Sequence, residues 1–235
     1  MNNDDELTVE EERARLACEI SVADLIKKIQ MPLSFTKNDY QVTVDVCSID
    51  TISDKDFDWA VNLVKRNLKD QYVEAKDMGW STPDKREEMS SDAPRFLIAR
   101  VNQRSIGYVH FQFSTEELGD VDQDAKLRYD LANWDKNGRM GAKPSICEEV
   151  AVVYCYELQL EAEAQGRGLG HHLMELMEQV GRVTGMYKSM LTVFKSNTRA
   201  IEFYSKRGYS IDPISPPKSM RASYDIMSKL LVTNL

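Results

Sequence analysis

One short stretch constrains this chain more than any other. It reads Gln-Gly-Arg-Gly-Leu-Gly at 165–170, after an apolar, strand-like run that ends at Leu160 and at the start of an amphipathic run that begins at Leu169. Glycines let backbone N–H groups gather at the start of a helix, where unpaired donors and the positive end of the helix dipole favour an anion such as a pyrophosphate. Gly168 and Gly170 are the positions where a side chain would obstruct its approach. The stretch therefore predicts a phosphate-binding loop, with a purely structural turn as the alternative.

A second motif follows another apolar strand candidate at Ser189–Phe194. Asn197, Ile201 and Tyr204 are spaced i, i+4 and i+7, so they share one face of a helix. The structural alternative makes Ser196 the N-cap of this helix and Tyr204 a half-buried core aromatic.

The two motifs, in this order and each preceded by a strand, resemble those of the GNAT N-acetyltransferase superfamily. The loop is not a P-loop, because no Gly-Lys-Ser/Thr follows its glycines. The resemblance implies an α+β fold, with a central twisted mixed sheet flanked by helices, and acetyl-CoA as cosubstrate. Tyr204 would then lie near the sulfur that leaves as a thiolate. The residues that the resemblance assigns to the cofactor are Leu158, Gln159, Leu160, Gln165, Gly166, Arg167, Gly168, Leu169, Gly170, Asn197 and Tyr204.

Composition favours one domain with a substantial core, because the chain has 235 residues of which 42% are hydrophobic and 29% charged. No apolar run approaches the roughly 18 residues of a membrane span, and the acidic start Met1–Glu12 is unlike a signal or transit peptide. We therefore expect a soluble protein without membrane partners, in the cytoplasm and nucleus. The net charge of -8 disfavours direct nucleic-acid binding and suits a basic peptide, although it also serves ordinary solubility.

The cysteines and histidines predict no metal site. Cys18, Cys47, Cys147 and Cys155 form no Cys-x-x-Cys pair and are expected to be reduced thiols. The three histidines lack ligand spacing to any acidic or cysteine cluster.

Periodicity divides the chain into an acidic tail and helix at 1–35 and a main domain at 36–235. Apolar spacing predicts one helix from Glu10 to about Gln30, ended by Pro32 and packed on the core. A charged stretch without clear period predicts an insertion at about 118–147. The other expected elements are a strand at Tyr40–Cys47, a helix around Trp59–Leu68, a short helix from an N-cap at Thr82 to Met89, a hairpin of Arg95–Val101 and Ile106–Phe113 joined by 102–105, a strand at Glu149–Leu160, helices at Gly168–Thr184 and Ser196–Arg207, and terminal strands at Tyr209–Ile211 and Ser223–Leu230.

Further segments resemble one GNAT branch, the NatD N-alpha-acetyltransferases, which acetylate the N-terminal serine of histones four and two-A. They are Asp58-Trp59-Ala60, Gly79-Trp80, Lys85-Arg86-Glu87-Glu88-Met89, Tyr154-Cys155-Tyr156-Glu157, Leu191-Thr192-Val193-Phe194-Lys195 and Ser223-Tyr224. The resemblance implies that the partner is the basic N-terminal peptide of a histone, and we expect the protein to be a monomer.

The same resemblance makes Glu157 the candidate base, acting through water, with Tyr156 beside it as a second catalytic residue. Strict strand alternation would put Tyr154 and Tyr156 on one side and Glu157 on the other. The resemblance implies a bulge, as GNAT fourth strands have, that lets both reach the cleft and frees an N–H for the thioester carbonyl. A solvated strand carboxylate is the alternative for Glu157.

Substrate binding falls, by the resemblance, to Tyr72, Glu116, Tyr154, Tyr156 and Tyr224. Two residues depart from the family: Ser114 stands where it has an Asp, and Met78 where it has a Trp, so we expect looser peptide selectivity. Asp77, Glu117 or an acid in the insertion are candidates to compensate. Two rival functions stay open, a lysine or polyamine acetyltransferase and a non-catalytic acetyl-CoA-binding module.

Overall fold

The computed structural model describes residues 7–37, 40–118 and 149–231. Its strands form one eight-stranded sheet in the order β1-β2-β3-β4-β5-β6-β8-β7. Neighbouring strands run antiparallel except β5 and β6, which are parallel. The strands are β1 Ser34–Lys37, β2 Tyr40–Ser48, β3 Arg95–Val101, β4 Arg104–Glu117, β5 Glu149–Leu160, β6 Lys188–Phe194, β7 Ser210–Ile211 and β8 Tyr224–Leu230. The predicted α+β class with a mixed sheet is confirmed.

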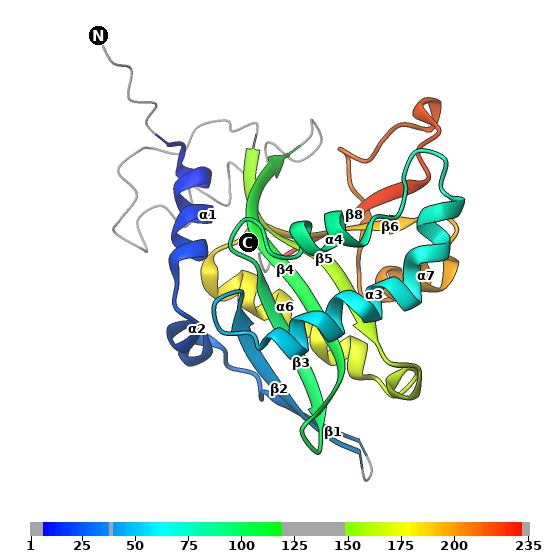
Figure 1. Ribbon diagram of the computed structural model, residues 1–235. Coiled ribbons are helices and arrows are strands. Elements are labelled where there is room, and N and C mark those ends of the chain that lie inside the picture. The colour runs from blue at the N-terminus through cyan, green and yellow to red at the C-terminus, as the bar shows by residue number, and fades with distance from the viewer. Residues whose placement is uncertain (1–6, 38–39, 119–148, 232–235) are drawn as a thin grey trace.

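Helices cover both faces of the sheet (Figure 1). They are α1 Val9–Glu19, α2 Val22–Lys28, α3 Asp54–Glu74, α4 Thr82–Glu88, α6 Leu169–Thr184 and α7 Thr198–Lys206, with short 3-10 turns at Ala162–Ala164 and Lys218–Met220. One face packs its apolar side chains against α1, α2, α6 and α7. The other packs against α3 and the residue that follows α4, Met89. Among the described helices, none is long and apolar enough to cross a membrane.

The N-terminal segment forms two helices where one was predicted. Ile20 is extended, with ψ of 129°, and the Ser21 side chain accepts the N–H of Asp24 to begin α2. The Arg95 guanidinium donates to the carbonyls of Cys18 and Ile20, at 2.6 and 3.0 Å, and so satisfies the end of α1. Because a side-chain cap and a buried guanidinium satisfy both new helix ends, the break is stable. The carboxylate of Glu10 accepts the N–H of Ala151 at 2.8 Å and ties α1 to β5.

Three other local predictions are corrected by the same kind of capping and turn chemistry. Ser81, not Thr82, is the N-cap of α4, and Asn197, not Ser196, is the N-cap of α7. The hairpin turns on two residues, Asn102 and Gln103, whose φ values of 48° and 68° suit a tight turn. Strand β1 was not predicted. Leu118, expected as the first residue of the insertion, is fully buried in the core, and residues 119–148 lie outside the described part.

Two irregularities of β5 shape the sheet where the candidate residues gather. Between β4 and β5 the register shifts, because His110 pairs with Glu157 and Phe111 with Cys155, which leaves Tyr156 as an extra residue. This is the predicted bulge, and it is confirmed. On its other edge β5 pairs with β6 only from Val152 to Cys155, although both strands continue. The two strands therefore separate after Cys155, beside the bulge.

Candidate functional site

The loop at 165–170 has the geometry of an anion cradle. Gly166 and Gly168 have φ values of 71° and 93°, which non-glycine residues rarely adopt. Gly168 is the N-cap of α6, and no side chain caps the first N–H groups of this helix. No acid lies in its first turn. Unpaired donors, the positive helix end and side-chain-free backbone together fit a pyrophosphate.

The other loop residues hold this cradle in place. Gln165 donates to the carbonyl of Leu160 at 3.3 Å, and the guanidinium of Arg167 lies 5.0 Å from the ring centre of Tyr40. A side chain at Gly170 would point toward Leu160 and Phe203, so this glycine faces other side chains of the protein. Its role is therefore close packing of α6 against β5 and α7, at least as much as access for an anion.

The separated edge of β5 leads from the bulge to this loop. Because β6 does not pair with β5 beyond Cys155, backbone groups of Leu158, Gln159 and Leu160 on that edge lack a strand partner. An extended amide-bearing arm can bond to such an edge as an added strand does. The side chains of Leu158 and Leu160 face the α6 core, whereas Gln159 points to the α3 face and accepts the Asn67 amide at 2.9 Å.

Asn197 and Tyr204 lie on α7, next to the end of β6. The Asn197 oxygen accepts the N–H of Ala200 at 3.1 Å, which leaves its amide nitrogen as a donor for a ligand. Tyr204 is 8% exposed and belongs to the α6-side core, and burial raises the pKa of its phenol well above the usual value. At neutral pH it is a protonated donor. It lies on the opposite face of the sheet from Glu157, where β5 and β6 separate.

Glu157 lies in a buried polar cluster between β5, α3 and α4. The residue is 3% exposed, and its carboxylate accepts Lys85 Nζ at 3.1 Å and Gln159 Nε2 at 2.7 Å. Burial raises the pKa of Glu157, and the Lys85 ammonium opposes that rise. The alternative of a solvated strand carboxylate is therefore wrong for its position, while its catalytic role stays a prediction.

Three residues of this cluster had no predicted role. Lys85 also donates to both oxygens of Glu88, at 2.8 and 2.9 Å, and to the Tyr72 hydroxyl at 3.1 Å. His110 is fully buried, stacks on Phe96 and has no hydrogen-bond partner on either ring nitrogen within the described part. Of these contacts, the sequence signals only the one between Lys85 and Glu88, which are spaced i, i+3 on one helix.

Aromatic residues surround the open side of this cluster. Tyr156 is 38% exposed, and its ring lies 5.2 Å from Tyr154 and 5.3 Å from His110. Tyr72 contacts the rings of Trp80 and Phe194. Three of the predicted substrate residues, Tyr72, Tyr154 and Tyr156, are thus brought together around Glu157.

The remaining substrate candidates lie farther along the same strands. Glu116 is opposite Val150 near the end of β4. Burial raises the pKa of its carboxyl above the ordinary value, although the Lys188 ammonium opposes this rise. Tyr224 pairs with Phe194 at the start of β8. Asp77, one of the acids considered as a replacement, instead accepts the N–H of Ser223 at 2.8 Å and joins the loop after α3 to the residue before β8.

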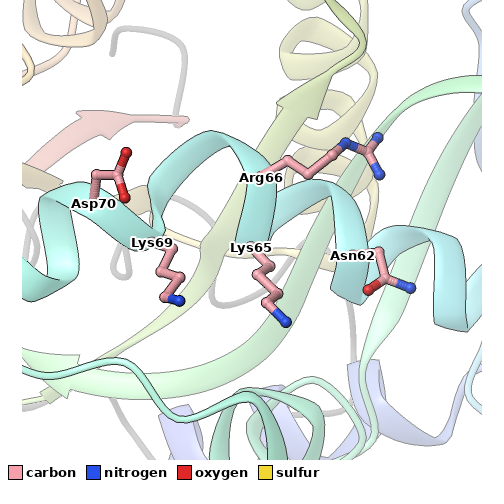
Figure 2. A pocket seen from close by; sticks show the side chains of 5 residues that line it. All are labelled: Asn62, Lys65, Arg66, Lys69 and Asp70. Carbon is pink, nitrogen blue, oxygen red and sulfur yellow. The ribbon is translucent and has the colours of Figure 1, made fainter.

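A hollow of about 460 Å³ lies elsewhere, on the outer side of α3 (Figure 2). Its walls are side chains of that helix alone, namely Asn62, Lys65, Arg66, Lys69 and Asp70. None of these five is buried, so the hollow has no built polar interior and we assign it no ligand. No cluster of three metal-binding side chains occurs in the described ranges.

Comparison with known proteins agrees with this geometry. Residues 64–209 match the acetyltransferase (GNAT) family. An uncharacterized protein of Bacillus subtilis, YxbD, is 29% identical over 119 residues, which cover 51% of this chain and 70% of that protein. The GNAT domain of S. lividans PAT has a TM-score of 0.51 at 12% identity, covering 84% of this chain and 94% of that one.

A NatC complex solved with Gag peptide and CoA includes a chain with a TM-score of 0.50 at 14% identity, covering 81% of this chain and 99% of that one. The family match covers more than half of the chain. This protein belongs to the GNAT acetyltransferase family, and acetyl-CoA is its cosubstrate.

Proposed function

We propose that this protein transfers the acetyl group of acetyl-CoA to the α-amino group of an N-terminal serine, as in the Ser-Gly-Arg-Gly start of histones four and two-A. One observation carries the proposal: a buried carboxylate, Glu157, lies at a β5 bulge among Tyr72, Tyr154 and Tyr156. The NatD-like segments around these residues support the choice of substrate, and the NatC complex gives an example of this fold with a peptide and CoA.

Chemistry favours an α-amine over a lysine here. An α-amine has a pKa near 7.7–8.0, against about 10.4 for lysine, so much less energy is needed to neutralise it. We assign Glu157 to take its proton through water, the free N–H at the bulge to the developing oxyanion, and Tyr204 to protonate the leaving thiolate. Tyr204 lies across the sheet from Glu157, so acid and base would approach the reacting atoms from opposite sides.

The peptide would lie over the aromatic residues, with its third residue, Arg, directed to Glu116. A carboxylate binds a guanidinium through charge-assisted hydrogen bonds that a lysine satisfies less well. Ser114 and Met78 replace family residues on this side, so we expect selectivity for arginine to be present but loose.

A CoA-release assay across synthetic peptides tests the function. Ser-Gly-Arg-Gly should be a better substrate than Ser-Gly-Ala-Gly, and the difference should shrink as salt rises. A peptide with a blocked N-terminus and an internal lysine should be the worst. Preference for that blocked peptide, or for a polyamine, would assign the protein to side-chain amines. Acetyl-CoA binding by calorimetry without CoA release on any amine would indicate a non-catalytic module.

A further inference from the structure

The most unusual group outside the predicted machinery is the ammonium of Lys85. It comes from α4, is 7% exposed, and lies between the carboxylates of Glu157 and Glu88. An unpaired charge at such depth is strongly unfavourable. The two buried charges, the Lys85 ammonium and the Glu157 carboxylate, therefore balance each other.

Lys85 does not itself act as a base. Burial lowers its pKa, but Glu157, Tyr72 and Glu88 together raise it above the ordinary value, so it stays an ammonium at working pH. Two carboxylates and one ammonium leave the cluster with an excess of one negative charge, which suits an incoming amine.

We propose that Lys85 is a positioning residue that keeps Glu157 ionised and fixes its carboxylate toward the bulge; this rests on the function proposed above. The other groups that face Glu157 do not replace this positive charge. From α3 comes the Tyr72 phenol, from α4 Glu88, and from β4 Tyr108 and the neutral ring of His110. From β5 come Cys155 and the amide of Gln159, and from α7, across the sheet, the Tyr204 phenol.

The test compares Lys85→Met with Lys85→Arg, and with Lys27→Met, which removes an ammonium from the exposed Asp24 of α2 on the other face of the sheet. An opposite charge in contact lowers a carboxyl pKa by about 1–3 units, so its loss should move the acidic limb of kcat/KM upward by about that much. Lys85→Met should therefore lose about 10- to 1,000-fold at low pH and recover as pH rises. The free substrate amine has the same pKa in every assay, so any difference between the pH profiles of the variants reports ionisation of an enzyme group.

Lys85→Arg should keep most of the wild-type profile, Lys27→Met all of it, and acetyl-CoA affinity should not change in any of the three. A loss that is the same at every pH would overturn the proposal and leave a merely structural ion pair. If Lys85→Met is insoluble, Lys85→Gln, which retains a donor, takes its place.

A second readout does not depend on turnover. Carboxyl-carbon NMR of protein with labelled glutamate, with the Glu157 signal assigned by its loss in Glu157→Gln, follows the ionisation directly. Its midpoint should rise in Lys85→Met. An unchanged midpoint would refute the role of Lys85, whereas a raised midpoint in a protein that acetylates no amine would refute only the proposed function.

Discussion

At the scale of single residues, burial changes what ordinary side chains can do. Glu157 and His110 lie opposite each other on β5 and β4, both almost completely withdrawn from water. Burial raises the pKa of the carboxyl, and burial together with the charge of Lys85 lowers the pKa of the imidazole to about 3. The first change makes Glu157 a better proton acceptor near neutral pH. The second keeps His110 uncharged.

Glu157→Gln keeps the size and polarity of the side chain but cannot accept a proton. We expect kcat to fall by about 10²–10⁴-fold with acetyl-CoA affinity unchanged, because only the proton transfer is lost. Steady-state kinetics and calorimetry measure the two quantities. A wild-type rate across the pH range would place the base elsewhere.

His110 should make the fold sensitive to acid. In the unfolded chain a histidine gains a proton near pH 6.5, whereas the buried ring resists protonation until about pH 3. The unfolded state thus binds more protons within this window, and the free energy of unfolding falls as pH falls. Between pH 7 and pH 5 this loss is about 2 kcal/mol.

The non-titrating variant His110→Met should lose less stability over the same interval. Urea unfolding at both pH values gives the comparison, whatever the absolute stability of the variant. Equal losses in the two proteins would mean that His110 is not the group responsible.

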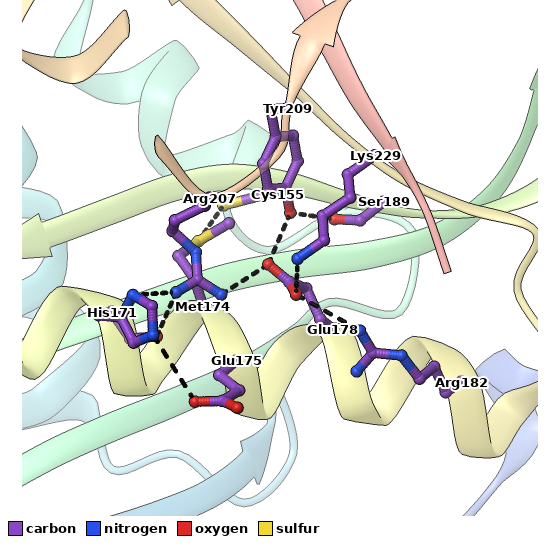
Figure 3. A network of polar contacts seen from close by, with 10 residues as sticks. All are labelled: Cys155, His171, Met174, Glu175, Glu178, Arg182, Ser189, Arg207, Tyr209 and Lys229. Atoms are coloured by element: carbon purple, nitrogen blue, oxygen red, sulfur yellow. Dashed lines mark hydrogen bonds and ion pairs between the residues drawn. The ribbon is translucent and has the colours of Figure 1, made fainter. Parts of the chain in front are cut away.

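At the scale of elements, the Glu178 carboxylate of α6 connects this helix to the end of α7, to β8 and, through Tyr209, to β6. Glu178 of α6 is buried and accepts Arg207, which follows α7, at 2.7 Å and Lys229 of β8 at 2.6 Å (Figure 3). Tyr209 connects the same carboxylate, at 3.4 Å, to Ser189 at the start of β6. This network holds α7, which carries Asn197 and Tyr204, against α6 and β6.

Removing one partner of such a buried network leaves the others uncompensated. Glu178→Gln should lower the free energy of unfolding by about 3–5 kcal/mol, because three cations, Arg182, Arg207 and Lys229, lose their counter-charge. Glu175→Gln is the matched control on the same helix: its carboxylate is exposed and lies 3.9 Å from His171, so the effect should stay within about 0.5 kcal/mol. Denaturant unfolding measures the free energy of unfolding of both variants. Similar losses in both variants would show that the network contributes little.

At the scale of the whole molecule, acetyl-CoA should stabilise the folded chain by mass action. At a ligand concentration of 100 times Kd the gain is about 2.7 kcal/mol. For a protein of this size, that raises Tm by roughly 5–10 °C.

Gly168→Asp should abolish this increase, because a negative charge at the helix N-cap would repel the pyrophosphate, and the added side chain would press on the Phe35 ring and distort the loop. Gly185→Asp is the control: Gly185 ends the same helix with a φ of 83°, so the substitution costs similar backbone strain away from the loop. Thermal melts with and without acetyl-CoA compare them. An increase that survives in Gly168→Asp would show that the loop is only a turn.

Features governed by neighbours in the chain were predictable from the sequence. The loop at 165–170 and the start of α6 follow from glycine geometry and apolar spacing within a few residues. The bulge at Tyr156 was expected from the family resemblance, which reconciles Tyr154 and Glu157 on one face where strict alternation would separate them. The capping errors at Ser81 and Asn197 are shifts of one residue, at which several polar side chains compete for the same N–H groups.

Only the tertiary structure decided which distant groups meet. The bond from Lys85 to Glu157 spans 72 positions, and nothing in the local spacing of α4 specifies its partner. The break between α1 and α2 depends on Arg95, 75 positions beyond Ile20, which supplies the donors that the helix end lacks. The physical reason is the same in both cases. Local dihedral preferences and side-chain caps determine where helices and strands begin, whereas the pairing of buried charges depends on how those elements pack, and burial gives Glu157, Lys85 and His110 their altered chemistry.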